Sequence, residues 1–152
     1  MLEKTFVFLK PETIMRGLVG ETVSRIENKG FNIAAMKLLW MTRDQAERLY
    51  EMHRGKEFYG QLIQHVTSGP IIAMVVEGPY AIRAVRKMVG ATNPVEAEPG
   101  SIRGDYALAT TCNIIHASDS KENAEREIKI FFRGDEILSY EKPTEKNYLF
   151  SP

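Results

Sequence analysis

The sequence predicts an α+β fold of the ferredoxin-like kind, in which a β-α-β-β-α-β chain order builds a four-stranded antiparallel sheet with helices on one face. Four short apolar runs alternate with segments whose apolar residues recur at helical spacing. The length of 152 residues fits a single domain, residues 1–152, that buries a core without a disulfide or metal staple. A parallel doubly wound sheet is the competing architecture, but it usually brings more strands and a glycine-rich phosphate loop.

The first elements are a strand, a helix and a second strand. Residues Thr5–Leu9 are continuously apolar, rich in β-branched and aromatic side chains, and predict a central strand. Apolar residues between Ile14 and Ile26 then recur every three or four positions, which predicts one helix that ends at Gly30. The alternation in Phe31–Met41 predicts a longer strand.

The middle of the chain continues the alternation of elements. Residues 42–45 form a capping-box pattern, so a helix is expected to begin there and to end near residues 54–55. A short helical pattern follows over residues 57–66, and Ile71–Val76 predicts a third buried strand. Apolar residues from 81 to 89 mark another helix, which Gly90 ends.

The last third of the chain combines a long loop with the final strand and helix. Residues 91–106 show no apolar periodicity and are rich in proline and glycine; a loop this long in a compact domain is usually functional. A fourth strand is expected over Asn113–His116, followed by a helix over residues 120–132. The tail from Lys142 is expected to be irregular.

Composition excludes several classes of function. Lys plus Arg and Asp plus Glu both number 20, and zero net charge argues against a general nucleic-acid or anionic-membrane binder. The single cysteine, Cys112, excludes an internal disulfide framework and suggests a reducing cytoplasm. No stretch approaches the roughly 20 apolar residues of a membrane span.

Familiar phosphate and metal motifs are absent. The sequence has no P-loop and no G-x-G-x-x-G pattern, so a backbone phosphate loop is not expected. It has no H-E-x-x-H and no closely spaced Cys and His ligands, which argues against a transition-metal site built from protein ligands. The sequence therefore predicts no residue that binds a metal ion directly.

A histidine at the junction of a strand and a helix is the strongest candidate for chemistry. In N-I-I-H-A-S-D-S, residues 113–120, the strand delivers His116 to a turn, and Ser118 to Ser120 offer helix caps. Imidazole is largely neutral near pH 7 and still nucleophilic, although a histidine in this position is more often a hydrogen-bonded boundary residue. His53 and His65 lie in helical patterns among polar neighbours and are interpreted as structural.

Cations close to predicted loops are candidates for binding phosphate. Lys10 follows the first strand, Arg86 lies on a helix, and Arg103 lies in the long loop that also holds Thr92. Arg offers bidentate donors, Lys a point charge and Thr a neutral donor, although each alone is usually a solvated surface group.

Three further side chains have an ordinary interpretation from the residues alone. Glu127, on the last predicted helix, is interpreted as a solvated helical carboxylate. Phe58 is either part of the core or, if exposed at a rim, able to stack on a base. The position of Tyr50 fits the core with its hydroxyl near a cleft.

Several blocks in order resemble the nucleoside diphosphate kinase family. The octet at residues 113–120 resembles its active-site signature, and the segments at 8–12, 16–21, 90–94 and 99–105 resemble further family blocks. The resemblance runs from about Glu3 to Tyr140, which is nearly the whole chain. One departure is Ala117, which stands where many members have Gly; a positive φ there would strain an alanine.

The resemblance implies an enzyme that moves the γ-phosphoryl group of a nucleoside triphosphate to a nucleoside diphosphate by a ping-pong reaction, with broad acceptance of bases. His116 would be the nucleophile, and Glu127 would hold its other ring nitrogen. The residues expected to bind substrate are Lys10, Tyr50, Phe58, Arg86, Thr92, Arg103, Asn113 and Ser118. Mg²⁺ would be bound mainly through the nucleotide phosphates. The family resemblance also implies a homo-oligomer, a hexamer in preference to a tetramer.

Two alternative functions are a non-catalytic nucleotide-binding or regulatory module on the same fold, and a nucleic-acid binder that uses the sheet face. The first would bind nucleotide without forming a phosphohistidine. The second is disfavoured by the zero net charge and by the lack of an aromatic R-G-F/Y-type strand motif.

Overall fold

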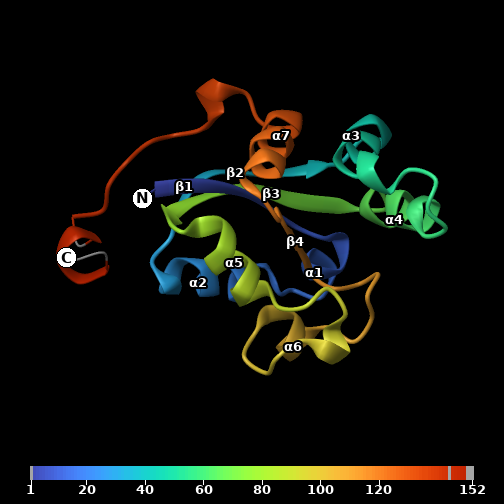
Figure 1. Cartoon of the computed structure of the whole chain (residues 1–152), viewed down its shortest axis with the longest axis horizontal. Helices are drawn as coiled ribbons and strands as arrows, with labels where there is room; N and C mark the ends of the chain where they lie inside the picture. The colour runs from blue at the N-terminus through green and yellow to red at the C-terminus, as the bar shows by residue number, and fades with distance from the viewer. Residues whose placement is uncertain (1, 144, 150–152) are drawn as a thin grey trace.

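One antiparallel sheet organises the fold. The computed structural model describes residues 2–143 and 145–149. Four strands pair in the order β2-β3-β1-β4, with β1 in the centre beside β3 and the short β4 (Figure 1). The strands are β1 (Leu2–Leu9), β2 (Asn32–Trp40), β3 (Pro70–Pro79) and β4 (Ile115–Ala117). The four-stranded antiparallel sheet of the ferredoxin-like prediction is confirmed.

Helices cover both faces of the sheet, and the prediction of one covered face was wrong. The two helices of the β-α-β-β-α-β core, α2 (Val19–Lys29) and α5 (Ala81–Val89), pack on the face formed by Val7 and Leu9. Three additional helices pack on the opposite face against Phe6 and Phe8 (Figure 1). These are α3 (Arg43–Leu49), α4 (Tyr59–Val66) and α7 (Lys121–Phe131). The physical reason is visible in β1, whose continuous apolar run is buried on both sides.

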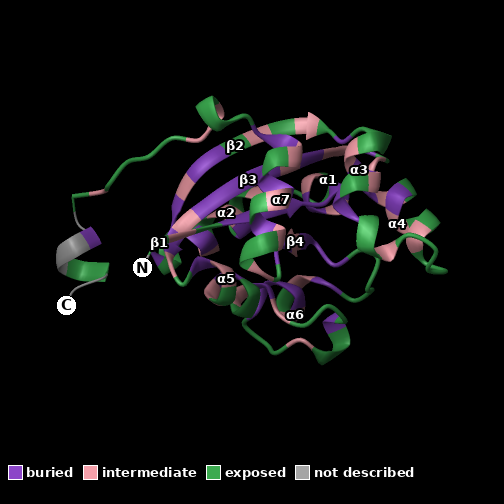
Figure 2. Ribbon diagram, turned by 45° about the horizontal axis from the view of Figure 1, so that its top comes forward, coloured by how far each residue is buried: buried purple, intermediate pink, exposed green. Residues whose placement is uncertain are grey.

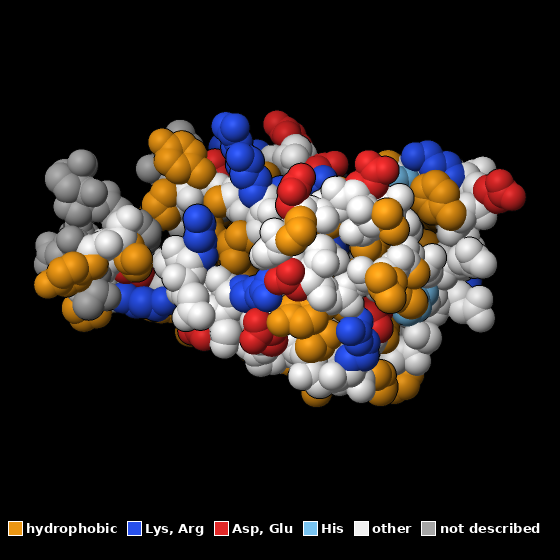
Figure 3. All heavy atoms as spheres, turned by 90° about the horizontal axis from the view of Figure 1, so that it is seen from below, with side chains coloured by type: hydrophobic (Ala, Val, Ile, Leu, Met, Phe, Trp, Pro, Cys, Tyr) orange, Lys and Arg blue, Asp and Glu red, His pale blue; other side chains and the backbone are white. Residues whose placement is uncertain are grey.

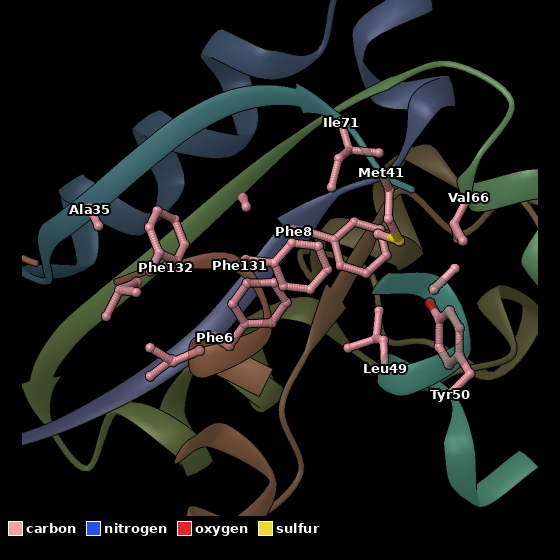
Figure 4. Close-up of a cluster of buried hydrophobic side chains, with 14 of the residues drawn as sticks. Phe6, Phe8, Ala35, Met41, Leu49, Tyr50, Val66, Ile71, Phe131 and Phe132 are labelled. Atoms are coloured by element: carbon pink, nitrogen blue, oxygen red, sulfur yellow. The ribbon is translucent and has the colours of Figure 1, made fainter. Parts of the chain in front are cut away.

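An aromatic core connects the sheet to the C-terminal helix. The rings of Phe6 and Phe131 stack with centroids 4.9 Å apart, and Figure 4 shows Phe8 next to this pair. All three side chains are buried, and Figure 2 shows buried residues concentrated along the central strands. This packing fixes α7 over β1, and therefore fixes every side chain that α7 presents to the neighbouring strand β4.

Two predicted boundaries change in the structure. The single helix expected between residues 14 and 26 is divided into α1 (Pro11–Met15) and α2, because Gly17 adopts a left-handed φ of 69° between them. The long loop contains a short helix, α6 (Ile102–Tyr106), which Ser101 caps by accepting from the Gly104 N–H. A short helix without apolar periodicity leaves no signal for sequence reasoning.

The remaining elements are short. The helix capped by Thr42 and Gln45 ends at Leu49, and a 3₁₀ turn continues the chain toward the cleft. The 3₁₀ turns are η1 (Glu51–His53), η2 (Pro94–Glu96) and η3 (Gly134–Glu136), and a π-helical turn, η4, spans Glu145–Leu149. The predicted irregular tail lies partly outside the described residues, at 144 and 150–152. Within the described part of the chain, no helix has the length and apolarity that crossing a membrane requires.

Candidate active site

A cavity of about 820 Å³ opens where the end of β1, the strand β4 and the helices α5 and α7 meet. Nearly all of the side chains proposed from the sequence line it, although they come from positions far apart in the chain. They are Lys10, Tyr50, Phe58, Arg86, Thr92, Arg103, Asn113, His116 and Glu127. Ser118 is the one candidate that does not line the cavity.

The segment before β4 is held in a strained conformation. Ile114 has a φ of 78°, which a β-branched residue rarely adopts and which costs on the order of 1–3 kcal/mol. Hydrogen bonds on both sides of the residue hold it there: the Ile114 N–H donates to Glu12 Oε2 at 3.0 Å, and its carbonyl accepts from the Lys10 N–H at 2.9 Å. The turn directs the next residues into β4, where Phe8 pairs with His116 and Val7 with Ala117. Ala117 therefore lies in a strand, and it is not among the residues of positive φ.

The imidazole of His116 is oriented through one ring nitrogen. Its Nε2 lies 2.7 Å from Glu127 Oε1, and a carboxylate can only accept, so Nε2 carries the proton. The ring stacks on Phe8 with centroids 5.2 Å apart, and the Tyr50 ring meets it edge-on. Among the described residues, none hydrogen-bonds to Nδ1, which keeps its lone pair.

Glu127 is itself held in place by two further groups. The Ser118 hydroxyl donates to Glu127 Oε1 at 2.6 Å, and the Arg126 guanidinium lies 3.6 Å from Oε2. Ser118 is buried behind the carboxylate, which explains why it does not line the cavity. Its structural position is therefore that of a support for Glu127, and its expected part in binding substrate stays a prediction.

Three cations, Lys10, Arg86 and Arg103, also line the cavity. Lys10 is 5% exposed, and its burial lowers the pKa of the ammonium to about 8, with Arg103 contributing in the same direction. Burial also lowers the pKa of Arg103 to about 10, with Arg86 next in importance. Such a concentration of partly desolvated positive charge favours a polyanionic ligand, because an anion offsets the repulsion between the cations.

Arg103 is fixed by the backbone around the strained turn. Its guanidinium donates to the carbonyl oxygens of Asn113, Gly90 and Ile115 at 3.2, 3.1 and 2.6 Å. Asn113 in turn accepts from Lys10 Nζ at 2.7 Å and donates to the Thr92 carbonyl at 3.0 Å. Arg has five N–H donors, so two of them remain for a ligand in the cavity.

The rim of the cavity is aromatic. Phe58 is 48% exposed, and the His53 ring meets it edge-on with centroids 5.2 Å apart. Burial lowers the pKa of His53, and nearby Lys56 adds to the effect. Tyr50 is buried deeper, and its desolvation, with Glu127 next, raises the pKa of the phenol, so that the hydroxyl stays protonated and can donate.

The sequence was compared with those of known proteins. The sequence model of the nucleoside diphosphate kinase family matches residues 3–137. The chain belongs to the nucleoside diphosphate kinase family. A nucleoside diphosphate kinase of Methanocaldococcus jannaschii is 63% identical over 138 residues, which cover 91% of this chain and 99% of that protein. Another, from Thermosipho melanesiensis, is 60% identical over 139 residues, 91% of this chain and 95% of that protein.

The fold agrees with solved structures of the nucleoside diphosphate kinase family. The halophilic enzyme from Halobacterium salinarum, solved in complex with CDP, superposes with a TM-score of 0.93 at 40% identity and covers 95% of this chain and 97% of that one. A family protein from Babesia bovis superposes with a TM-score of 0.90 at 38% identity, covering 93% of this chain and 96% of that one. The chain is thus an enzyme of nucleotide phosphotransfer.

Sequence reasoning missed several residues of this nucleoside diphosphate kinase cavity. His53, Thr111 and Asp119 also line it. His53 was interpreted as structural because it lies among polar neighbours, and its helical pattern carries no signal that it faces a cleft. Asp119 was expected only to begin the last helix, whose cap is Ser120; Asp119 Oδ1 accepts from the Asn123 side chain instead.

The carboxylates of the cavity do not form a cage for a metal ion. In the described part of the lining they are Glu127 and Asp119, and Glu127 is already occupied by His116, Ser118 and Arg126. The donor set fits a Mg²⁺ ion that takes its ligands mainly from phosphate oxygens and water, as this ion commonly does in sites that bind phosphate.

Proposed function

We propose that the enzyme carries the γ-phosphoryl group of a nucleoside triphosphate on His116 and then passes it to a nucleoside diphosphate. The observation that carries this proposal is the 2.7 Å contact between His116 Nε2 and Glu127, which leaves the Nδ1 lone pair on a cavity lined by Lys10, Arg86 and Arg103. A nucleophile whose second nitrogen is fixed by a carboxylate needs no proton transfer before it attacks.

Both half-reactions use the same atoms in reverse. Nδ1 of His116 forms a bond to the γ-phosphorus, and the bond from that phosphorus to the β-phosphate oxygen breaks, so that the diphosphate leaves. The imidazolium that results keeps its Nε2–H on the Glu127 carboxylate, which stabilises the positive charge. A terminal oxygen of a second diphosphate then attacks the phosphorus, and Nδ1 leaves as neutral imidazole. This is a ping-pong exchange through one site.

The other residues of the cavity position and neutralise the phosphates in this proposal. Phosphoryl transfer needs alignment and charge neutralisation more than covalent work by the protein. Arg86, Thr92 and the two free donors of Arg103 hold phosphate oxygens, while Lys10 and Asn113 lie between the phosphates and the ribose hydroxyls. Tyr50 donates within the same pocket. Mg²⁺ held by the phosphates supplies further neutralisation of their charge.

Recognition of the base is proposed to rest on stacking against Phe58. The exposed ring stands at the rim, and an aromatic face accepts any base, because every base has a π-face. We therefore infer that all common bases are accepted.

Labelling of the intact protein tests the proposal directly. Incubation with γ-labelled ATP and Mg²⁺ is expected to place label on His116 in a linkage that is stable to alkali and lost in acid. Added ADP, GDP, CDP or UDP should each remove the label as the corresponding triphosphate. Nucleotide binding without any labelled protein would overturn the enzymatic proposal in favour of a regulatory nucleotide-binding module.

The buried Lys10 predicts a pH dependence of catalysis. Because its pKa is lowered to about 8 in the free enzyme, the ammonium loses its proton as pH rises through 8, and kcat/KM is expected to decline there. Bound phosphates restore the charge, so kcat itself should stay nearly flat from pH 7 to 9. The measurement is the pH profile of both constants.

Lys10→Met supplies the control for this profile. The variant removes the titrating group while keeping the shape, so its kcat/KM should be lower but level across the same range. A decline near pH 8 that persists in the variant would mean that another group causes the decline.

The lowered pKa of Lys10 also affects stability. The folded protein binds fewer protons than the unfolded chain between about pH 8 and 10.5, so the free energy of unfolding contributed by Lys10 rises with pH in that window.

Nucleic acid does not compete well as a ligand. Lys and Arg are interspersed with Asp and Glu over the face in Figure 3, without a continuous basic surface. Zero net charge gives no general attraction for phosphate backbones.

We propose a single domain over residues 1–152, acting in the cytoplasm, in a homo-oligomer of six subunits. Its exposed Cys112 thiol suits a reducing compartment. The edge strand β2 exposes Met36, Leu38 and Trp40, an apolar surface that a contact between copies would cover. Sedimentation equilibrium should give the mass of a hexamer, and a monomer mass would contradict this assembly.

A further inference from the structure

A cluster of three metal-ligating side chains lies outside the cavity. Glu12 on α1, His65 on α4 and Cys112 before β4 place one ligand atom each within 4.8 Å of one another. Glu12 and His65 are already in contact, with Oε1 and Nε2 2.7 Å apart. A second hollow of about 330 Å³ adjoins the cluster and is lined by His65, Thr111, Ser68, Gln61 and Gln64. The proposed phosphotransfer uses none of the three side chains.

We propose that Glu12, His65 and Cys112 form a site for a divalent transition-metal ion of the Zn²⁺ type. Thiolate, imidazole and carboxylate are the three ligand types that Zn²⁺ takes in proteins, and Mg²⁺ does not compete for thiolate sulfur. The site is distinct from that of the nucleotide-bound Mg²⁺, whose ligands are oxygens. The sequence gives no sign of it, because the fold assembles the ligands from three elements that lie far apart in the chain.

The geometry needs little adjustment to hold the ion. Bonds of about 2.0–2.3 Å to a tetrahedral Zn²⁺ separate ligand atoms by roughly 3.3–3.8 Å. The present separations extend to 4.8 Å at most, so side-chain movements on the order of 1 Å bring the three atoms onto one sphere. The ion replaces the Glu12–His65 hydrogen bond: the thiol proton is released to solvent, and His65 binds through Nε2 with its proton on Nδ1. The adjoining hollow leaves room for water at a fourth position.

The environment prepares the ligands in two ways. Glu12 Oε2 accepts a hydrogen bond from the Ile114 N–H, so the backbone already orients this carboxylate. Outer partners of metal ligands usually have this orienting role. Cys112 is exposed and forms no disulfide, so its sulfur is accessible to an ion from solvent. Because Ile114 is the strained residue two positions before His116, an ion on Glu12 would also stabilise the turn that delivers the nucleophile.

Titration of the full-length, metal-free enzyme with Co²⁺ tests the site without nucleotide. The reductant is a phosphine, since a thiol would compete for the metal. We expect one equivalent of Co²⁺ per chain and the thiolate-to-cobalt charge-transfer absorption in the near ultraviolet. One equivalent of Zn²⁺ should abolish the band, whereas a large excess of Mg²⁺ should leave it unchanged.

Variants distinguish this cluster from binding elsewhere. Cys112→Ser and His65→Gln should each lose the band and weaken Zn²⁺ binding at least about tenfold, because loss of even an outer-shell partner of a metal ligand typically costs 10- to 100-fold. Glu122→Gln removes an exposed carboxylate on α7 and should keep both. Far-UV circular dichroism and the thermal midpoint of the metal-free variants establish that they are folded. Absence of the band in the unaltered enzyme, or its persistence in His65→Gln, would overturn the proposal.

Discussion

Replacing His116 with alanine is expected to lower kcat by roughly 10⁴-fold or more, because the reaction loses the atom that carries the phosphoryl group. Direct transfer would need two nucleotides bound at once, whereas the proposed exchange uses one site in turn. Label from γ-labelled ATP should no longer appear on the protein. The measurements are the steady-state rate of phosphoryl exchange and the label retained on the denatured chain.

Nucleotide affinity provides the internal control for this variant. Lys10, Arg86 and Arg103 are unchanged, and Glu127 keeps its contacts with Ser118 and Arg126, so the Kd for a diphosphate should change by less than about threefold, within about 0.6 kcal/mol. A variant that retained a few per cent of the original kcat, or that was labelled on another residue, would remove His116 from the proposed role. Loss of binding together with activity would indicate a collapsed cavity instead.

The sheet and its core helices were predictable because the pattern of apolar residues is local. The run at Thr5–Leu9 and the helical spacing after residue 81 each report their own element. What this pattern does not report is which face a helix covers. Within β1, the run Phe6–Leu9 is apolar and buried at every position, and only that continuity indicated a second covered face.

The candidate site, like the fold, was predictable only in part. Nine of the side chains that line the cavity were proposed from the sequence, mainly through the family resemblance, whereas their contacts depend on how β4 and α7 are packed. Ser118 illustrates the difference: it follows His116 by two residues, but its hydroxyl donates to Glu127 and Ser118 does not line the cavity. Likewise, the strain anticipated at Ala117 is located at Ile114, where hydrogen bonds to Glu12 and Lys10 hold the turn.

Replacing Arg103 with methionine is expected to reduce both stability and catalysis, the largest combined effect among the binding residues. The guanidinium is 5% exposed and satisfies the carbonyls of Gly90, Asn113 and Ile115. Unpaired buried carbonyls cost about 1–3 kcal/mol each, partly offset because a buried charge is also removed, so the free energy of unfolding should fall by about 3 kcal/mol. Loss of one phosphate-binding cation should lower kcat/KM by roughly 10²-fold.

Two matched substitutions separate the structural contribution of Arg103 from its charge. Arg103→Lys keeps the cation but cannot reach three carbonyls at once, so it should recover part of kcat/KM and little of the stability. Arg16→Met also removes a guanidinium that donates to a backbone carbonyl, that of Tyr106, but at an exposed site, and should cost less than about 1 kcal/mol. Denaturant unfolding at one protein concentration gives the stabilities. If Arg103→Met unfolded at the denaturant concentration of the original enzyme, the three carbonyl contacts would not hold the turn. If the variant lost stability but kept kcat/KM, Arg103 would hold the turn without binding phosphate, and the second of its two proposed roles would be wrong.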